Sequence, residues 1–167
     1  MSVDDRLVKN LTEEVGVEHA ELLGVISAGR IGRYAAAVDD SNPLYRDAEY
    51  ARSLGYAHVV APPNLIAAVI NWTSGAAYDR LREDGTEADL HLPGVPASGV
   101  RVMGGGEEIE FVAPIVAGTE VSRTTVLLDI NQRESKTGPL VVARYKDHYT
   151  DSSGAALVNS VRTVILR

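Results

Sequence analysis

The chain has 167 residues, of which 45% are hydrophobic and 23% are charged, and its formal net charge is −7. This composition suits one globular domain, and we expect it to span residues 1–167. The absence of cysteine excludes disulfides, thiolate metal ligands and a cysteine nucleophile, and the four scattered histidines do not indicate a metal site. The acidic balance, without any Lys/Arg run, argues against a nucleic-acid partner.

The N-terminus and the longest apolar stretch bear on where the protein works. The start, MSVDDRLVKNLTEEVG, is acidic and polar, and it lacks the basic beginning and apolar core of a signal peptide. The apolar residues 59–77 are interrupted by Pro62, Pro63 and Asn64, which favours a buried core helix over a membrane span. We therefore expect a cytoplasmic protein without a membrane partner.

The first half of the chain predicts one strand followed by helices. We expect a strand at 20–27, short helices at 29–38 and 47–54, and a longer helix at 62–77. Pro62 and Pro63 suit the first turn of a helix, where a missing N–H costs little. Beyond them, Leu65, Val69 and Trp72 recur at helical spacing on a broad apolar face, so other structure should cover this helix on most sides.

The second half predicts strands. After a Gly/Pro-rich loop at 83–99, we expect strands at 106–111, 119–132, 140–151 and 155–166, separated by turn signals and arranged as an antiparallel meander. In the third of these strands, Val141 and Tyr145 share one face, while Arg144 and Lys146 share the other. Helices segregated from strands indicate an α+β domain in which an antiparallel sheet wraps one long central helix.

A polar cluster follows the first predicted helix. Asp40, Asn42 and Tyr45 bring a carboxylate, an amide and a phenol together within six residues. Pro43 disfavours helical geometry at Asn42, so the helix should end near Asp39 or Asp40. Such a cluster can project into a shared cavity. It can equally be an Asx turn that simply ends a helix.

The pattern Asp40-x-Asn42-Pro43-Leu44, followed by Val60-Ala61-Pro62-Pro63, resembles the MaoC-like (R)-specific enoyl hydratases and dehydratases. The resemblance is closest to their N-terminal, FAS1-like dehydratase half. It extends over nearly the whole chain from about Asp5, and the segment GGGEEIEF at 104–111 agrees with it. It implies a hot-dog fold, in which the sheet wraps a central helix.

The resemblance also implies a reaction: reversible hydration of an enoyl thioester, carried by CoA or an acyl carrier protein, without a further cofactor. In active members an Asp and a His five residues later activate the water, and an Asn between them orients the site. Asp40 and Asn42 fall on the Asp and the Asn, and Tyr45 falls on the position of the His. A phenol titrates near ~10 and imidazole near ~6.5, so Tyr45 is a poor proton shuttle at neutral pH.

A second departure concerns the site that binds the thioester oxygen. Active members have His-Gly-Met where the central helix begins, and the Gly N–H binds this oxygen. Here Pro62-Pro63-Asn64 takes that place, and neither proline has an N–H. The first free donors should therefore be those of Asn64 and Leu65.

Three further residues complete the expected substrate-binding set. His58 precedes the central helix and could replace the missing imidazole, although a solvated loop histidine is the simpler interpretation. Gly104 and Gly105 could let the backbone approach the acyl or pantetheine channel closely, with a plain loop as the alternative.

Three hypotheses follow. The chain is the half of an enoyl hydratase that lacks a full catalytic pair and contributes acyl binding and interface beside a catalytic MaoC-like subunit. Alternatively, it is a self-sufficient homodimeric hydratase that uses Asp40, or a non-catalytic module that binds acyl thioesters. For the first hypothesis, a single hot-dog layer leaves a sheet edge and one helix flank exposed, which favours a homodimer or a heteromer.

Overall fold

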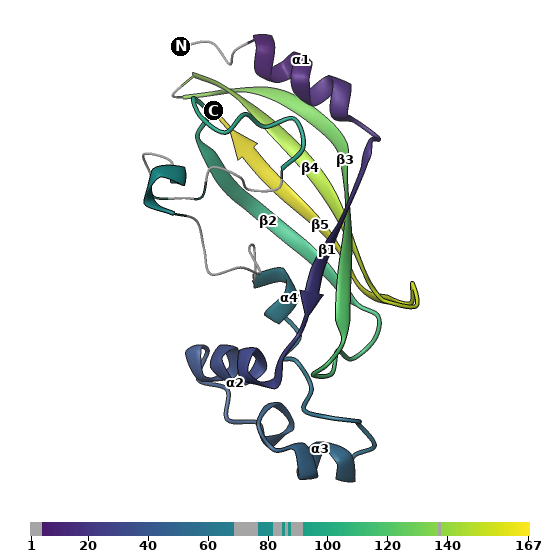
Figure 1. The fold of residues 1–167 in the computed structure, drawn as a ribbon. Helices are drawn as coiled ribbons and strands as arrows, with labels where there is room; N and C mark the ends of the chain where they lie inside the picture. Colours follow the sequence, from purple (N-terminus) through teal and green to yellow (C-terminus); the bar gives the residue numbers. More distant parts are fainter. Residues whose placement is uncertain (1–4, 69–76, 82–84, 86, 88–91, 137) are drawn as a thin grey trace.

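The computed structural model describes residues 5–68, 77–81, 85, 87, 92–136 and 138–167. A curved five-stranded antiparallel sheet has the order β1-β3-β4-β5-β2 (Figure 1). Its strands are β1 (Glu18–Val25), β2 (Val102–Phe111), β3 (Glu120–Ser135), β4 (Gly138–Asp151) and β5 (Ala156–Leu166). The helices are α1 (Asp5–Glu14), α2 (Ala28–Ala37), α3 (Ala48–Ser53) and α4 (Leu65–Ala68), with 3-10 turns η1 (Pro43–Tyr45) and η2 (Tyr78–Arg80).

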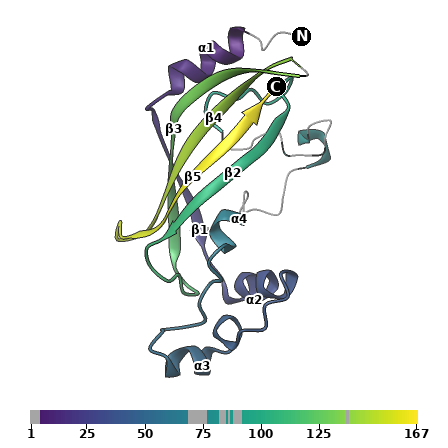
Figure 2. The ribbon, with the colours of Figure 1, turned by 180° about the vertical axis from the view of Figure 1, so that it is seen from behind.

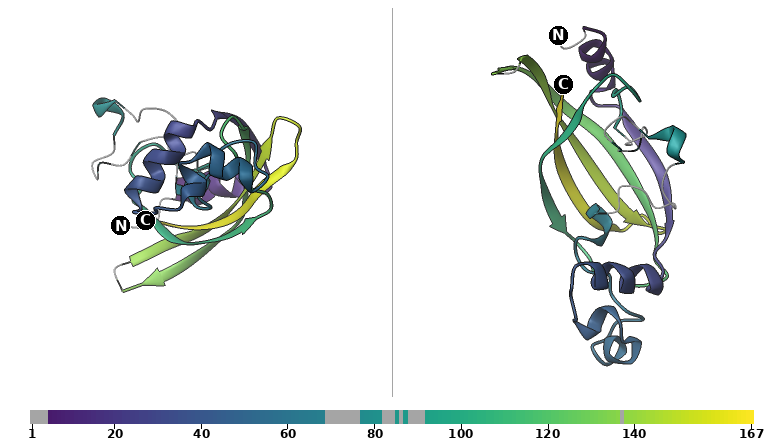
Figure 3. Two further views of the ribbon diagram at one scale, coloured as in Figure 1. Left: turned by 90° about the horizontal axis from the view of Figure 1, so that it is seen from below. Right: turned by 90° about the vertical axis from the view of Figure 1, so that its left-hand side faces the viewer.

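The helices lie at the two ends of the sheet and inside its curve. α4 lies on the concave side, and α2 and α3 extend beyond one end of the sheet (Figures 2 and 3). α1 covers the opposite end, next to β3 (Figure 1). The sheet therefore has an α2 end and an α1 end.

Side-chain caps fix where the short helices begin. The Ser27 hydroxyl accepts the Arg30 N–H ahead of α2, and Asp47 accepts the N–H groups of Glu49 and Tyr50 ahead of α3. The helices predicted at 29–38 and 47–54 are confirmed to within a residue at each end. α1 was not anticipated from the sequence.

The central helix is described only at its beginning, as α4. The rest of the predicted helix at 69–76, including Val69 and Trp72, lies outside the described residues. The prediction that it reaches Ala77 is wrong, because Ala77 is extended, with φ −63° and ψ 153°, and precedes η2.

The expected strands are confirmed, but the four-strand meander is wrong in part. β3, β4 and β5 are consecutive neighbours, whereas β2 pairs with β5 at one edge of the sheet. The chain between β2 and β3 crosses the α2 end instead of turning back. Ala113 donates to the Leu157 carbonyl at 3.1 Å, and Gly118 donates to the Ile26 carbonyl at 2.8 Å. These bonds fix the path of the connection, so that β3 pairs with β1.

The concave face of the sheet carries two apolar clusters. The α2-end cluster comprises Ile26, Ile31, Val59, Ala61, Leu65, Ile66, Ile115, Val121, Tyr149, Leu157 and Val158. The α1-end cluster comprises Leu7, Leu11, Leu127, Val141, Ala143, Tyr145, Val164 and Leu166. The alternation predicted for β4 is confirmed: Val141 and Tyr145 are fully buried, and Arg144 and Lys146 are exposed. No helix among the described residues has the length and apolar character needed to cross a membrane.

Candidate functional site

The Asp40 cluster forms the turn that follows α2. The helix ends at Ala37, slightly before the predicted position, and Asp39 adopts a left-handed φ of 56°. The Asp40 carboxylate then accepts the Asn42 N–H at 3.0 Å, and the Asn42 side-chain oxygen accepts the Leu44 N–H at 3.0 Å. Both side chains therefore hold the local backbone, as Asx turns do.

Tyr45 lies half-buried against the α2-end cluster. Burial raises the pKa of its phenol, and the nearby Asp40 charge raises it further, while a hydrogen bond with the Asn42 side chain opposes the shift. A phenol whose pKa lies above its ordinary value is even less able to exchange a proton at neutral pH. The environment thus strengthens the argument against Tyr45 as a proton shuttle.

The fold brings this turn beside the segment that leads into α4. Val60 donates to the Leu44 carbonyl at 3.0 Å, and Ala61 donates to the Ile115 carbonyl at 2.7 Å. The 59–61 segment is thereby clamped between η1 and the chain that crosses from β2 to β3. Two motifs separated by about twenty residues in the sequence are neighbours in the structure.

The start of α4 offers fewer donors than expected. The Leu65 N–H donates to the Pro62 carbonyl at 3.0 Å, so the expectation of a free donor at Leu65 is wrong. This i→i+3 bond closes a turn at the start of α4, with the Pro62 carbonyl pointing forward along the chain towards Leu65. Pro63 has no N–H. Of the expected thioester-binding donors, this leaves Asn64, which is exposed.

His58 is half-buried, and its ring is used locally. Its Nδ1 accepts the N–H of the next residue, Val59, at 2.8 Å. The neutral ring therefore carries its proton on Nε2, which is the atom left for other contacts. Within the described residues, no hydrogen bond joins His58 to Asp40 or Tyr45.

Gly104 and Gly105 lie away from the Asp40 turn. They belong to a bulge in the edge strand β2, where Gly104 pairs with Val164 of the α1-end cluster. A Cβ on Gly105 would lie 2.8 Å from the Thr163 Cγ2 atom. The neighbouring strand therefore explains why glycine is needed at 105. The structure does not bring these glycines together with the other predicted site residues.

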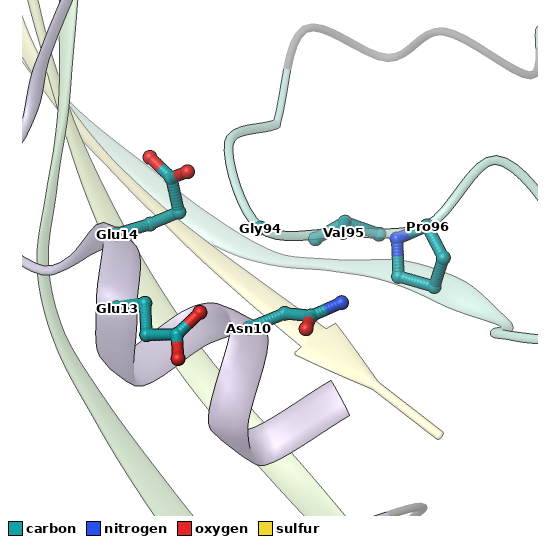
Figure 4. A pocket seen from close by; sticks show the side chains of 6 residues that line it. All are labelled: Asn10, Glu13, Glu14, Gly94, Val95 and Pro96. Carbon is teal, nitrogen blue, oxygen red and sulfur yellow. The ribbon is translucent and has the colours of Figure 1, made fainter. Parts of the chain in front are cut away.

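One pocket lies at the α1 end (Figure 4). It has a volume of about 330 Å³ and lies between α1 and the loop that follows residue 92. Its lining residues are Asn10, Glu13, Glu14, Gly94, Val95 and Pro96. Among the described residues, its charged lining is the two carboxylates of Glu13 and Glu14, which disfavours the phosphates of CoA there.

Sequence reasoning missed a row of polar groups on the concave face. We call it the polar belt: Arg123, Thr125, Asp147 and Ser160 are buried, and Arg162, which pairs with Asp147, is partly buried. Asp147 is fully buried; it accepts the Thr125 hydroxyl at 2.6 Å and the Arg162 Nε at 2.5 Å. Arg123 pairs with Glu21 of β1. Asp147 shares a strand face with Val141, Ala143, Tyr145 and Tyr149, but the sequence alone does not show that polar residues of β3 and β5 lie beside it.

Sequence relatives support the expected family. The model for the FAS1-like, dehydratase domain region matches residues 13–160. A UPF0336 protein of Streptomyces griseus is 31% identical over 83% of this chain and 81% of its own length. A UPF0336 protein of Streptomyces avermitilis is 32% identical, with the same coverage of both chains.

Solved structures share the fold. The ChsH1-ChsH2 complex from Mycobacterium tuberculosis contains a chain with a TM-score of 0.70 at 16% identity, covering 96% of this chain and 90% of that one. The (R)-hydratase from A. caviae gives 0.59 at 18% identity, with coverages of 90% and 95%. A chain of the HadBC dehydratase complex from M. tuberculosis gives 0.61 at 17% identity, with coverages of 91% and 96%. The expected hot-dog fold is confirmed, and the chain belongs to the family of FAS1-like dehydratase domain regions.

Proposed function

We propose that this chain is the subunit of an enoyl-thioester hydratase that lacks the full catalytic pair. One observation carries the proposal: the polar groups of the Asp40 turn are engaged in holding the turn itself. Asp40 and Asn42 cap local N–H groups, and Tyr45 stands at the family's His position with a raised pKa. Water activation needs a group that exchanges protons near neutral pH, which this turn does not offer.

The oxyanion side of the chemistry points the same way. An enolate-like thioester oxygen needs preorganised donors, most often backbone N–H groups at a helix start. Pro62 and Pro63 contribute none, and the Leu65 N–H is bonded to Pro62. A catalytic MaoC-like partner would then supply the Asp, the His and the oxygen-binding N–H.

A heteromer fits the similar structures. The ChsH1-ChsH2 and HadBC assemblies each join two different subunits, and both contain a chain with this fold. In the proposed complex this chain contributes acyl-binding surface and interface, and the substrate is an acyl-CoA or acyl-carrier-protein thioester. Among the described strands, β2 lies at an edge of the sheet, where a partner sheet can pair with its backbone.

The test is an assay of crotonyl-CoA hydration with the chain alone and in a mixture with a MaoC-like subunit that carries the intact Asp and His. We expect background rates alone and turnover in the mixture. Asp40→Asn is the sharp variant, because an amide keeps an oxygen for the Asn42 N–H but cannot act as a base. Asp39→Asn is its matched control. Turnover by the isolated chain that Asp40→Asn removes and Asp39→Asn preserves would overturn the proposal.

One observation favours the alternative of a self-sufficient homodimer. The Asp40 charge reaches the Tyr45 phenol, so a carboxylate and a proton donor do lie near one another. Such an enzyme would show the Asp40→Asn loss just described. Tight acyl-CoA binding without turnover in any mixture would instead indicate a non-catalytic binding module.

A further inference from the structure

The polar belt runs across the middle of the concave face. The strand register places Thr125 of β3 opposite Asp147 of β4, and Asp147 opposite Ser160 of β5. One row toward the α2 end, Arg123 faces Tyr149; one row toward the α1 end, Tyr145 faces Arg162. Polar groups thus occupy three strands at the same height in the sheet.

The belt separates the two apolar clusters. Val121 and Val158 belong to the α2-end cluster, whereas Leu127 and Val164 belong to the α1-end cluster. Along β3, the distance from Val121 to Thr125 is four residues, or roughly 13 Å of strand. The apolar surface on the α2 side of the belt is therefore short.

Among the described residues, the candidate site adjoins the α2-end cluster. Tyr45 packs against that cluster, and Leu65 and Ile66 of α4 are members of it. An acyl chain whose thioester lies near the Asp40 turn and α4 would therefore meet the α2-end cluster first. To extend further along the concave face, it would have to pass the belt.

Contact with the belt would not stabilise a bound alkyl chain. Asp147 is fully buried, and Arg123 and Thr125 are each 4% exposed, so these groups are already removed from water. Among the described residues, Arg123 Nε and the Ser160 hydroxyl are buried without a hydrogen-bond partner. A methylene group laid over them could not supply the missing bonds, and it would disturb charges that are costly to bury unpaired.

We infer that the polar belt limits the length of the acyl chain that this protein accepts, so that it selects short and medium-chain thioesters over long-chain ones. This inference rests on the proposed function, because it assumes that the chain contributes acyl binding. Thr125, Asp147 and Arg162 are its specificity-determining residues, since they form the hydrogen-bonded centre of the belt.

The experiment compares the affinities of butyryl-, octanoyl- and palmitoyl-CoA by calorimetry, for the full chain alone and mixed with the catalytic MaoC-like subunit used in the hydration assay. A methylene buried among apolar atoms tightens binding about fourfold, which corresponds to about 0.8 kcal/mol. We expect octanoyl-CoA to bind at least about tenfold tighter than butyryl-CoA. Palmitoyl-CoA should then stay within about threefold of octanoyl-CoA, because its added methylenes meet the belt.

An apolar belt variant sharpens the test. The triple change Thr125→Val, Asp147→Leu and Arg162→Met removes the hydrogen-bonded group together, which leaves no lone buried charge among the three. It should tighten palmitoyl-CoA binding at least about tenfold relative to octanoyl-CoA. The matched control is Asp129→Leu with Arg144→Met. These two residues form an ion pair on the outer face of β3 and β4, and its removal should leave the chain-length profile as it is.

The outcomes are distinct. Palmitoyl-CoA binding about tenfold tighter than octanoyl-CoA in the wild-type protein would overturn the inference, as would an unchanged profile in a folded belt variant. If the variant does not fold, the wild-type profile decides by itself. No binding at any chain length, alone or in the mixture, would overturn the proposed function and the length limit with it.

Discussion

The Asp147–Arg162 pair allows the energetics of the polar belt to be measured directly. Arg162→Met removes the guanidinium but keeps much of the apolar stem. Asp147 then remains fully buried with the Thr125 hydroxyl at 2.6 Å as its one remaining side-chain donor among the described contacts. It loses two charge-assisted bonds from Arg162, at 2.5 Å and 3.2 Å.

The expected cost is large because a buried charge is left without its counter-ion. Breaking a buried pair from one side costs about 3–5 kcal/mol, whereas replacing both partners by apolar groups is often neutral. For a domain of this size, such a loss lowers Tm by about 10 °C. The double change Asp147→Leu with Arg162→Met should therefore be more stable than Arg162→Met alone.

Urea unfolding of the wild type, both single variants and the double variant gives the four corners of a double-mutant cycle. The m-value should stay constant, so that the midpoints report free energies. If Arg162→Met costs less than about 1 kcal/mol, Asp147 is not dependent on this partner and the account of the belt fails. Strictly additive single and double changes would refute the coupling as well.

Three further predictions concern other parts of the chain. Gly105→Ala should lower the free energy of unfolding in urea by about 1–3 kcal/mol, because its Cβ would lie 2.8 Å from Thr163. Gly104→Ala is the control: its Cβ would have open space, so it should change the free energy of unfolding by less than about 0.5 kcal/mol. Equal effects of the two changes would contradict the packing argument. Burial raises the pKa of the Tyr145 phenol, so the folded state favours the neutral phenol. The neutral phenol therefore contributes fully to the free energy of unfolding below about pH 10, and this contribution is lost as the pH rises further. The urea midpoint should therefore fall as the pH rises above about 10, and Tyr145→Phe should reduce that fall. Tyr45→His should leave the isolated chain at background crotonyl-CoA hydration, because the prolines ahead of α4 still lack N–H groups; clear turnover would show that the missing imidazole was the sole defect.

Local signals in the sequence predicted the elements well. Period-2 alternation in 140–151 identified β4, and the polar caps at Ser27 and Asp47 lie where the helices predicted nearby begin. The amphipathic helix α1 was not predicted, because the sequence around it is mostly polar, although Leu7 and Leu11 mark its buried side. The partner of β2 could not be predicted, because pairing with β5 depends on where the β2–β3 connection crosses the sheet and not on either strand alone.

For the candidate site, the sequence by itself determined which catalytic residue types the chain has and which it lacks. Tyr45 at the expected His position and the adjacent Pro62 and Pro63 are properties of residue type, so they needed no coordinates. The tertiary structure alone decided what the polar atoms are doing. Asp40 and Asn42 cap backbone N–H groups, the Leu65 donor is taken by Pro62, and Gly104 lies with the other end of the sheet.

The polar belt, in contrast, depends on the tertiary structure. Each of its members reads in the sequence as an ordinary polar residue on a strand. Only the antiparallel register sets Thr125, Asp147 and Ser160 in one row, buried between two apolar clusters. Whether a charge is buried and paired depends on the residues that surround it in space. In a sheet, the hydrogen bonds between strands decide which residues these are, and distance along the sequence does not.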